Sequence, residues 1–239
     1  MEKPYVNLED RIRFRNLKDE GEFSHFKSNL NPKLPGGIKI IGIAGTKGGV
    51  GKSTISHAIC FSATKHFGRA SVLIYTDDDE IEQPKRDYDI ADCSTNIDNP
   101  GYLGFTRAFE IIEDNLDTLS YVVIDGAAGR QEVDQVISQA CDLVFIPTMT
   151  DVKSLKRCAA DLEHYPNAFA IVVGYKRSPS RPHKEIERDE RITRYIPESR
   201  ISWVIPEIEE FERIVEGDVS VGLSTRTYNA MRDLVRLVD

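Results

Sequence analysis

The sequence is short of cysteines and of long apolar runs, and both shortages exclude classes of protein. Its four cysteines, Cys60, Cys93, Cys141 and Cys158, include no CxxC pair, and two of them fall inside apolar runs. We therefore expect buried free thiols, as in the reducing cytosol, rather than disulfides or a metal site. No stretch approaches the roughly 18 apolar residues of a spanning helix, and the N-terminus lacks a signal peptide's apolar segment. The sequence predicts a cytoplasmic protein.

Excess positive charge is absent as well. The chain of 239 residues has 31 Lys and Arg against 39 Asp and Glu, for a formal net charge of -8. Any contact with nucleic acid therefore needs a local basic patch. Residues 176–200 hold eight basic and five acidic residues. Sequence-independent contacts to DNA phosphates are predicted there, from Lys184, Arg188, Arg191 and Arg194. A solvated helix with i,i+4 charge pairs accounts for the same charges equally well.

The order of apolar and polar segments predicts an arm followed by one α/β domain. Residues 1–37 are polar and end in a proline- and glycine-rich linker, whereas residues 38–239 form the expected domain. Short apolar runs predict strands at 38–44, 71–75, 121–124, 143–146, 168–173 and 201–204. Helices are predicted between and after them at 52–67, 107–116, 131–140, 154–163, 184–195 and 225–238. This alternation predicts a mostly parallel sheet with helices on both faces, and the polar stretch 80–102 is expected to be a functional loop.

The most specific motif begins directly after the first predicted strand. It matches GxxxxGK[ST], the phosphate-binding P-loop, and precedes a predicted helix. Lys52 is expected to reach the β and γ oxygens of a nucleotide, Ser53 to bind Mg²⁺, and Thr54 to lie near the α-phosphate. The predicted ATP-binding residues are Gly45, Thr46, Lys47, Gly48, Gly49, Val50, Gly51, Lys52, Ser53 and Thr54.

The second lysine of this loop, Lys47, gives it the sequence KGGVGKST. This closely resembles the signature of the ParA/MinD family of deviant Walker A ATPases, a P-loop fold, and the resemblance covers residues 38–239. It implies that Lys47 takes a catalytic role by reaching the phosphates of a partner subunit in an ATP-dependent homodimer. On the residues alone, Lys47 could equally be a solvated loop lysine.

Two acidic positions complete the predicted chemistry. Asp125 ends an apolar strand, as a Walker B acid does, and is expected to hold the water shell of Mg²⁺. The resemblance also implies that Asp78, in the run Thr76-Asp77-Asp78-Asp79, orients the attacking water. Thr76 stands where the family has a first acid, and three consecutive acids permit a register in which Asp77 or Asp79 takes the role.

Base recognition carries a weaker signal. The resemblance implies contacts to adenine from residues 174–176 and from Pro206 and the residues after it. The Asn that the family usually has after its fifth strand is missing here. No NKxD guanine motif is present either, so ATP is predicted on the resemblance alone.

The resulting functional hypothesis is a ParA-like, Mg-dependent ATPase that positions or partitions DNA or another cargo. The resemblance implies non-specific DNA binding, nucleoid association and an activating partner like ParB. A MinD-like membrane role is one alternative, but residues 225–239 end in acid and contain only three arginines, which favours a core-packing helix. An ATP-dependent synthetase of the same fold, acting on a small metabolite near residues 80–102, is another. An electron carrier is disfavoured because no cysteine lies near Asp125.

Overall fold

The computed structural model describes the part of the chain that contains the P-loop and most of the predicted sheet. The described residues are 38–75, 89–92, 119–126, 141–165, 167–175 and 189–206, together with Arg232 and Val235. The predictions for the arm at 1–37, for Asp78, for Lys184 and Arg188, and for the helices at 107–116 and 131–140 lie outside these residues.

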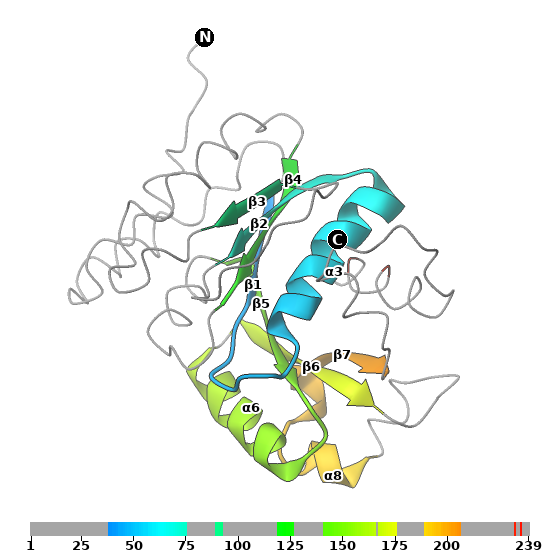
Figure 1. The fold of residues 1–239 in the computed structure, drawn as a ribbon. Helices are drawn as coiled ribbons and strands as arrows, with labels where there is room; N and C mark the ends of the chain where they lie inside the picture. The colour runs from blue at the N-terminus through cyan, green and yellow to red at the C-terminus, as the bar shows by residue number, and fades with distance from the viewer. Residues whose placement is uncertain are drawn as a thin grey trace, which may run out of the picture.

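A parallel sheet forms the centre of the described structure (Figure 1). It has seven strands in the order β3-β2-β4-β1-β5-β6-β7, and each adjacent pair is parallel. The predicted fold class is therefore confirmed, because such a sheet buries both faces under helices. The strands are β1 (Lys39–Ile43), β2 (Ala70–Tyr75), β3 (Asp89–Asp92), β4 (Leu119–Asp125), β5 (Leu143–Thr148), β6 (Ala168–Tyr175) and β7 (Ile201–Pro206).

Strand β3 was not predicted, because it lies within the polar stretch that was expected to be a loop. Its sequence, Asp-Ile-Ala-Asp, has no apolar run, yet it pairs with β2 from Val72↔Asp89 to Tyr75↔Asp92. It lies at one edge of the described sheet. Polar residues are tolerated in such a strand, since only one side of it is paired with a neighbour. The six predicted strands are all present, with ends that differ by at most two residues from the predicted ones.

Helix α3 (Lys52–Phe67) covers one face of the sheet and has the predicted bounds (Figure 1). It ends at Gly68, whose φ of 61° turns the chain so that the Arg69 N–H bonds to the Ala63 carbonyl at 3.0 Å. Its apolar residues include Ile55 and Ile59, which are at most 1% exposed. They pack in one cluster with Ile43 and other residues of the same sheet face.

Helix α6 (Val152–His164) covers the opposite face. Leu155, Cys158 and Leu162 pack in a second cluster, which includes Ile40 of β1. The next residue of that strand, Ile41, belongs to the first cluster. Strand residues alternate between faces, so the two clusters lie on opposite sides of the sheet. The sequence predicts this helix to begin at Ser154, but it begins two residues earlier.

A short turn before β7 supplies hydrogen bonds to the C-terminal end of α6. The 3₁₀ turn η3 (Glu198–Arg200) directly precedes β7. From this turn the Arg200 guanidinium donates to the carbonyls of Leu162 and Tyr165, at 3.0 and 2.8 Å, and to that of Ala168 at the start of β6, at 3.0 Å. Two carbonyl groups at the end of the helix, those of Leu162 and of the C-cap Tyr165, therefore have hydrogen-bond donors although the helix has ended.

Helix α8 (Glu190–Thr193) is shorter than the helix predicted for residues 184–195. A continuous helix is wrong at Asp189, which has φ −86° and ψ 88° and accepts a hydrogen bond from the Arg191 N–H at 3.2 Å. Asp189 is thus an N-cap, a position at which a short acidic side chain competes with the helical backbone. Helix formation starts after it.

The cysteine prediction is confirmed for three residues. Cys60, Cys141 and Cys158 are buried free thiols, and Cys93 lies outside the described residues. Burial raises the pKa of Cys158 to about 12, with the nearby Asp161 charge adding to the effect. Burial also raises the pKa of Cys141. The Cys141 and Cys158 thiols are therefore unreactive at neutral pH. Among the described helices, none has the length and apolarity required to cross a bilayer.

Candidate functional site

The P-loop connects the end of β1 with the start of α3, next to the point where the order of the strands changes direction. Three of its glycines have positive φ: Gly45 at 128°, Gly49 at 69° and Gly51 at 90°. At Gly45 space is limiting too, because a Cβ would lie 3.2 Å from the Ile146 Cγ2. A side chain at these positions would strain the loop. In open α/β sheets this location at the strand carboxyl ends is the usual place for a ligand.

The N-terminus of α3 can receive an anion. Its N-cap is Gly51, which has no side chain to bond the first helical N–H groups, and its first turn contains no acidic residue. The helix therefore directs its N–H groups and the positive end of its dipole towards the loop. Lys52 is 7% exposed, and its Nζ donates to the Lys47 carbonyl at 3.1 Å. Ser53 and Thr54 are half-buried beside it. These groups fit the phosphates of a nucleotide.

Asp125 lies where a Walker B acid is expected. It is the last residue of β4, is 1% exposed, and is in register with Ile43 of β1 and Tyr75 of β2. The Gly126 N–H donates to the Ile43 carbonyl at 2.8 Å, so the end of β4 is hydrogen-bonded to the end of β1, just before the P-loop. Carboxylate and hydroxyl oxygens are ligands that Mg²⁺ accepts, and Asp125 and Ser53 both lie at this edge of the sheet.

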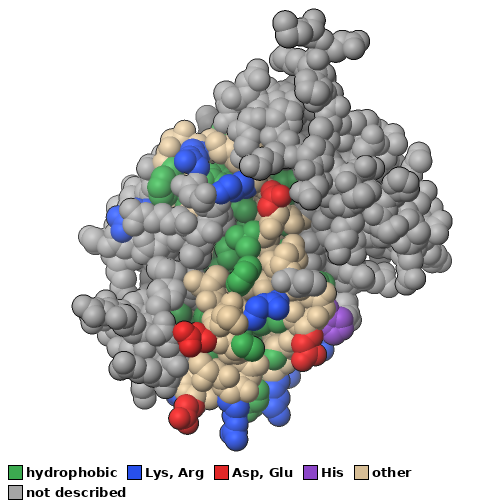
Figure 2. Space-filling view, turned by 180° about the vertical axis from the view of Figure 1, so that it is seen from behind, with side chains coloured by type: hydrophobic (Ala, Val, Ile, Leu, Met, Phe, Trp, Pro, Cys, Tyr) green, Lys and Arg blue, Asp and Glu red, His purple; other side chains and the backbone are tan. Residues whose placement is uncertain are grey.

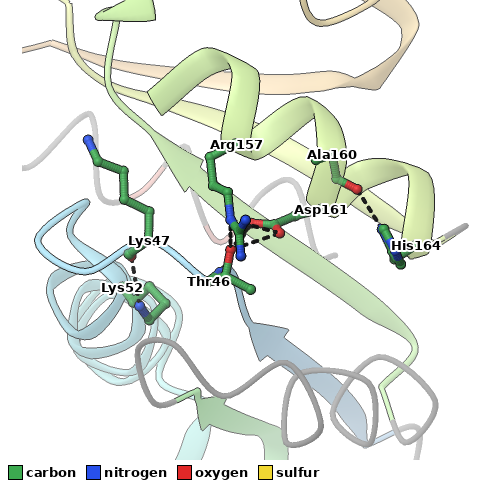
Figure 3. A network of polar contacts seen from close by, with 7 residues as sticks. All are labelled: Thr46, Lys47, Lys52, Arg157, Ala160, Asp161 and His164. Atoms are coloured by element: carbon green, nitrogen blue, oxygen red, sulfur yellow. Dashed lines mark hydrogen bonds and ion pairs between the residues drawn. The ribbon is translucent and has the colours of Figure 1, made fainter. Parts of the chain in front are cut away.

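Lys47 has its side chain directed away from Lys52, as Figure 3 shows. Its Nζ contacts the Ser154 Oγ and lies 3.6 Å from the Asp151 carboxylate, both at the start of α6. Asp151 is also the N-cap of this helix and accepts from the Ser154 N–H at 3.0 Å. Hydrogen bonds from Ser154 lower the pKa of Asp151, and the positive charge of Lys47 lowers it further by a smaller amount. Lys47 is thus held by its own chain in this structure.

Thr46 is bonded to the C-terminal half of the same helix (Figure 3). Its N–H donates to the Asp161 carboxylate at 3.1 Å, and its Oγ1 donates to the same carboxylate at 2.9 Å. Arg157 donates to the Thr46 Oγ1 and lies 3.8 Å from Asp161. Asp161 is only 7% exposed, so its charge is balanced chiefly by these donors.

Sequence reasoning missed these four residues of α6. Asp151, Ser154, Arg157 and Asp161 follow one another at spacings of three, three and four, so they lie along one side of the helix. That spacing is visible in the sequence. That these residues contact the P-loop is not visible in the sequence, because the P-loop precedes them by more than 100 residues.

Other predicted contact residues lie farther along the sheet. Pro206 ends β7, which is separated from β1 by β5 and β6. Tyr175, one of the residues expected to contact the base, is 2% exposed, and its hydroxyl donates to Asp189 at 3.2 Å. Its ring therefore belongs to the core.

Of the four predicted DNA-contacting residues, the structure describes Arg191 and Arg194. Arg191 donates to Asp189 at 2.8 and 2.5 Å, and this bond lowers the pKa of Asp189. Arg194 directly follows α8 as its C-cap. On the face shown in Figure 2, basic and acidic side chains are interspersed over the described residues.

Comparison with known proteins agrees with this geometry. Residues 41–221 match the family model "CobQ/CobB/MinD/ParA nucleotide binding domain". The MinD cell division protein of Aquifex aeolicus is 17% identical, with a TM-score of 0.59 over 84% of this chain and 96% of that one. Pyrococcus horikoshii MinD, complexed with Mg-ADP, is 16% identical, with a TM-score of 0.58 over 84% and 96%.

A ParA family ATPase from Chlorobium tepidum TLS has the same fold. It is 17% identical, with a TM-score of 0.56 over 83% of this chain and 98% of that one. No match to a curated protein sequence was found. The family model covers more than half of the 239 residues and includes the P-loop, β4 and α6. The chain therefore belongs to the CobQ/CobB/MinD/ParA family of nucleotide-binding domains.

Proposed function

We propose that this protein is a Mg-dependent ATPase that dimerises on binding ATP and uses hydrolysis to position DNA or another cargo. The observation that carries the proposal is the P-loop with its two lysines directed oppositely. The Lys52 side chain, at the start of α3, points back to the loop and bonds the Lys47 carbonyl, whereas the Lys47 side chain points away from it (Figure 3). One lysine is thus available for the chain's own nucleotide and the other for a facing subunit.

The residues at the carboxyl edge of β1 and β4 supply the binding groups. Loop N–H groups and the α3 N-terminus would hold the phosphates, Lys52 would neutralise charge on the β and γ oxygens, and Thr54 would contribute a hydroxyl. Ser53 and Asp125 would hold Mg²⁺, which neutralises charge on the phosphates when it is bound. Mg-ADP is bound by the MinD of P. horikoshii, which has the same fold. Asp78 remains the proposed residue for orienting water.

The proposed dimer rests on Lys47. In this structure its side chain is 29% exposed and contacts Ser154 and Asp151 of its own chain. The ion pair with Asp151, whose side chain is 51% exposed, is worth little. Phosphates on a facing subunit carry more negative charge in a more buried setting, so they would compete well for this lysine. Dimerisation would then depend on the triphosphate.

DNA is the proposed surface, and a protein like ParB the proposed activator. Support comes from the basic stretch that contains Arg191 and Arg194 and from the similarity to a ParA family ATPase. On this proposal the protein is cytoplasmic and associates with the nucleoid in its ATP state. Among proteins of the same fold, the MinD of A. aeolicus forms a complex with MinC, which supports the idea that such domains work with protein partners.

The decisive experiment measures mass and turnover together. Light scattering in nucleotide-free, ADP and non-hydrolysable ATP forms should give a dimer with the ATP analogue alone. Phosphate release should be stimulated by DNA, and retention on DNA should fall steeply as salt rises, because released counterions set the slope. Lys47→Ala is the matched variant: it should lose the dimer and keep most of the ATP affinity.

The outcomes separate the candidate functions. Equal mass in all three forms, together with wild-type turnover in Lys47→Ala, would refute the dimer switch. An ATP-dependent dimer that is retained on anionic vesicles and not on DNA would favour the MinD-like role. Stoichiometric consumption of a metabolite with ATP would favour a synthetase.

A further inference from the structure

The first half of the P-loop is attached to α6 through a carboxylate that no part of the proposed chemistry uses. Asp161 accepts from both the backbone N–H and the hydroxyl of Thr46, at 3.1 and 2.9 Å. Its side chain is 9% exposed, compared with 53% for Arg157, which donates to the same hydroxyl. A carboxylate this buried is stabilised only if donors surround it, and Thr46 supplies two of them.

This attachment determines the path of the loop towards the nucleotide. Thr46 lies between Gly45, whose φ of 128° brings the chain against Ile146 and Asp161, and Lys47, whose carbonyl accepts from Lys52 at 3.1 Å. The two bonds to Asp161 use both donors of Thr46, so the residue cannot rotate without losing one of them. The positions of the Lys47 carbonyl, and with it of Lys52, follow from this restraint.

We propose that Asp161, supported by Arg157, is a positioning residue that keeps the P-loop in its phosphate-receiving shape before nucleotide arrives. The proposal rests on the proposed function, since it concerns ATP binding at the same loop. A loop that is competent for only a fraction of the time binds its ligand more weakly by that fraction. Loss of charge-assisted bonds to Thr46 should therefore weaken Mg-ATP binding roughly tenfold to a hundredfold.

The chain offers a matched control at the start of β1, the strand that leads into the P-loop. Asp142 accepts from the Ile40 N–H at 2.9 Å, so it too bonds a backbone group at β1, but at the end remote from the P-loop. Asp142→Ala removes a similar bond without touching Thr46. It should lower the thermal midpoint and leave the Kd for Mg-ATP within about twofold of the wild type.

The test compares Asp161→Asn, Asp161→Ala and Thr46→Val with Asp142→Ala in the full-length protein. Affinity is measured with a fluorescent ATP analogue, folding by circular dichroism, and loop opening by amide hydrogen exchange without nucleotide. The Asp161 variants should bind more weakly and exchange faster at residues 45–51, and Thr46→Val should show a smaller change of the same sign. If Asp161→Ala does not fold, Asp161→Asn and Thr46→Val carry the test.

Hydrogen exchange separates failure of this inference from failure of the proposed function. If the wild type does not bind Mg-ATP, the proposed function is wrong, and faster exchange of the loop in Asp161→Asn still supports the restraint. If folded Asp161 variants bind ATP like the wild type and their loop amides exchange at the wild-type rate, the inference is overturned and Asp161 has only a structural role.

Discussion

Replacing Asp151 separates two effects that its carboxylate has at the start of α6. The carboxylate caps the helix by accepting from the Ser154 N–H at 3.0 Å, and it lies 3.6 Å from the Lys47 Nζ. Loss of an N-cap costs about 1 kcal/mol, whereas an ion pair between exposed groups contributes about 0.2–1 kcal/mol. The two side chains here are 29% and 51% exposed, so the lower part of that range applies. Asp151→Ala should therefore lower the free energy of unfolding by about 1–2 kcal/mol.

Asp151→Asn is the informative partner variant, because asparagine caps helices as well as aspartate does. It should cost less than about 0.5 kcal/mol, and this cost should shrink at high salt because charges near the surface are screened. The folded-state pKa of Asp151 is lowered, so the charge stabilises the fold above its unfolded pKa of about 3.9 and ceases to do so as pH falls through the folded pKa. The difference between wild type and Asp151→Asn should thus close in acid.

Urea unfolding followed by circular dichroism measures these differences. Lys153→Ala is the control, since Lys153 is exposed on the same helical turn and its replacement should change stability by less than about 0.5 kcal/mol. If Asp151→Asn costs as much as Asp151→Ala, and the cost persists at high salt, then capping does not account for the effect of Asp151.

Four further predictions concern the site and the core. Lys52→Ala should reduce ATP affinity at least about a hundredfold while the circular dichroism spectrum stays unchanged; tight Mg-ATP binding by this variant would remove the loop as the nucleotide site. Asp78→Ala should bind ATP, accumulate as dimer and stop turnover, whereas persistent turnover would assign the role to a neighbouring acid. Asp125→Asn should raise the Mg²⁺ concentration needed for half-maximal turnover, and an unchanged requirement would exclude it as a ligand. Ile59→Ala, at a fully buried position of α3, should cost about 2–5 kcal/mol in urea unfolding, and a cost below about 1 kcal/mol would contradict the packing described.

Much of the fold followed from local pattern. The bounds of α3 were predictable because a P-loop motif marks its start and Gly68 marks its end. Strand β3 was not predicted, since its sequence has no apolar run. It is a strand because its backbone pairs with β2. The predicted helix over Asp189 failed because charge pattern does not distinguish a helix interior from an N-cap.

The positions of the candidate site residues were predictable where a short sequence motif identifies them. The P-loop residues and Asp125 are fixed by motif and by the end of an apolar strand. The attachment of Thr46 and Lys47 to α6 and its N-cap was not predictable, because the contacting residues are separated by 104 to 115 positions. Such contacts depend on how the helix packs across the sheet.

The Arg200 guanidinium has a mechanical consequence for α6. It bonds carbonyls at the C-terminal end of the helix and at the start of β6, while Asp151 and Ser154 contact the P-loop lysine Lys47 at the N-terminal end of the same helix. Because the helix is bonded near both ends, we expect it to move as one rigid element. A movement of the loop that shifts α6 should therefore also displace η3 and β7, at the edge of the sheet beyond β5 and β6.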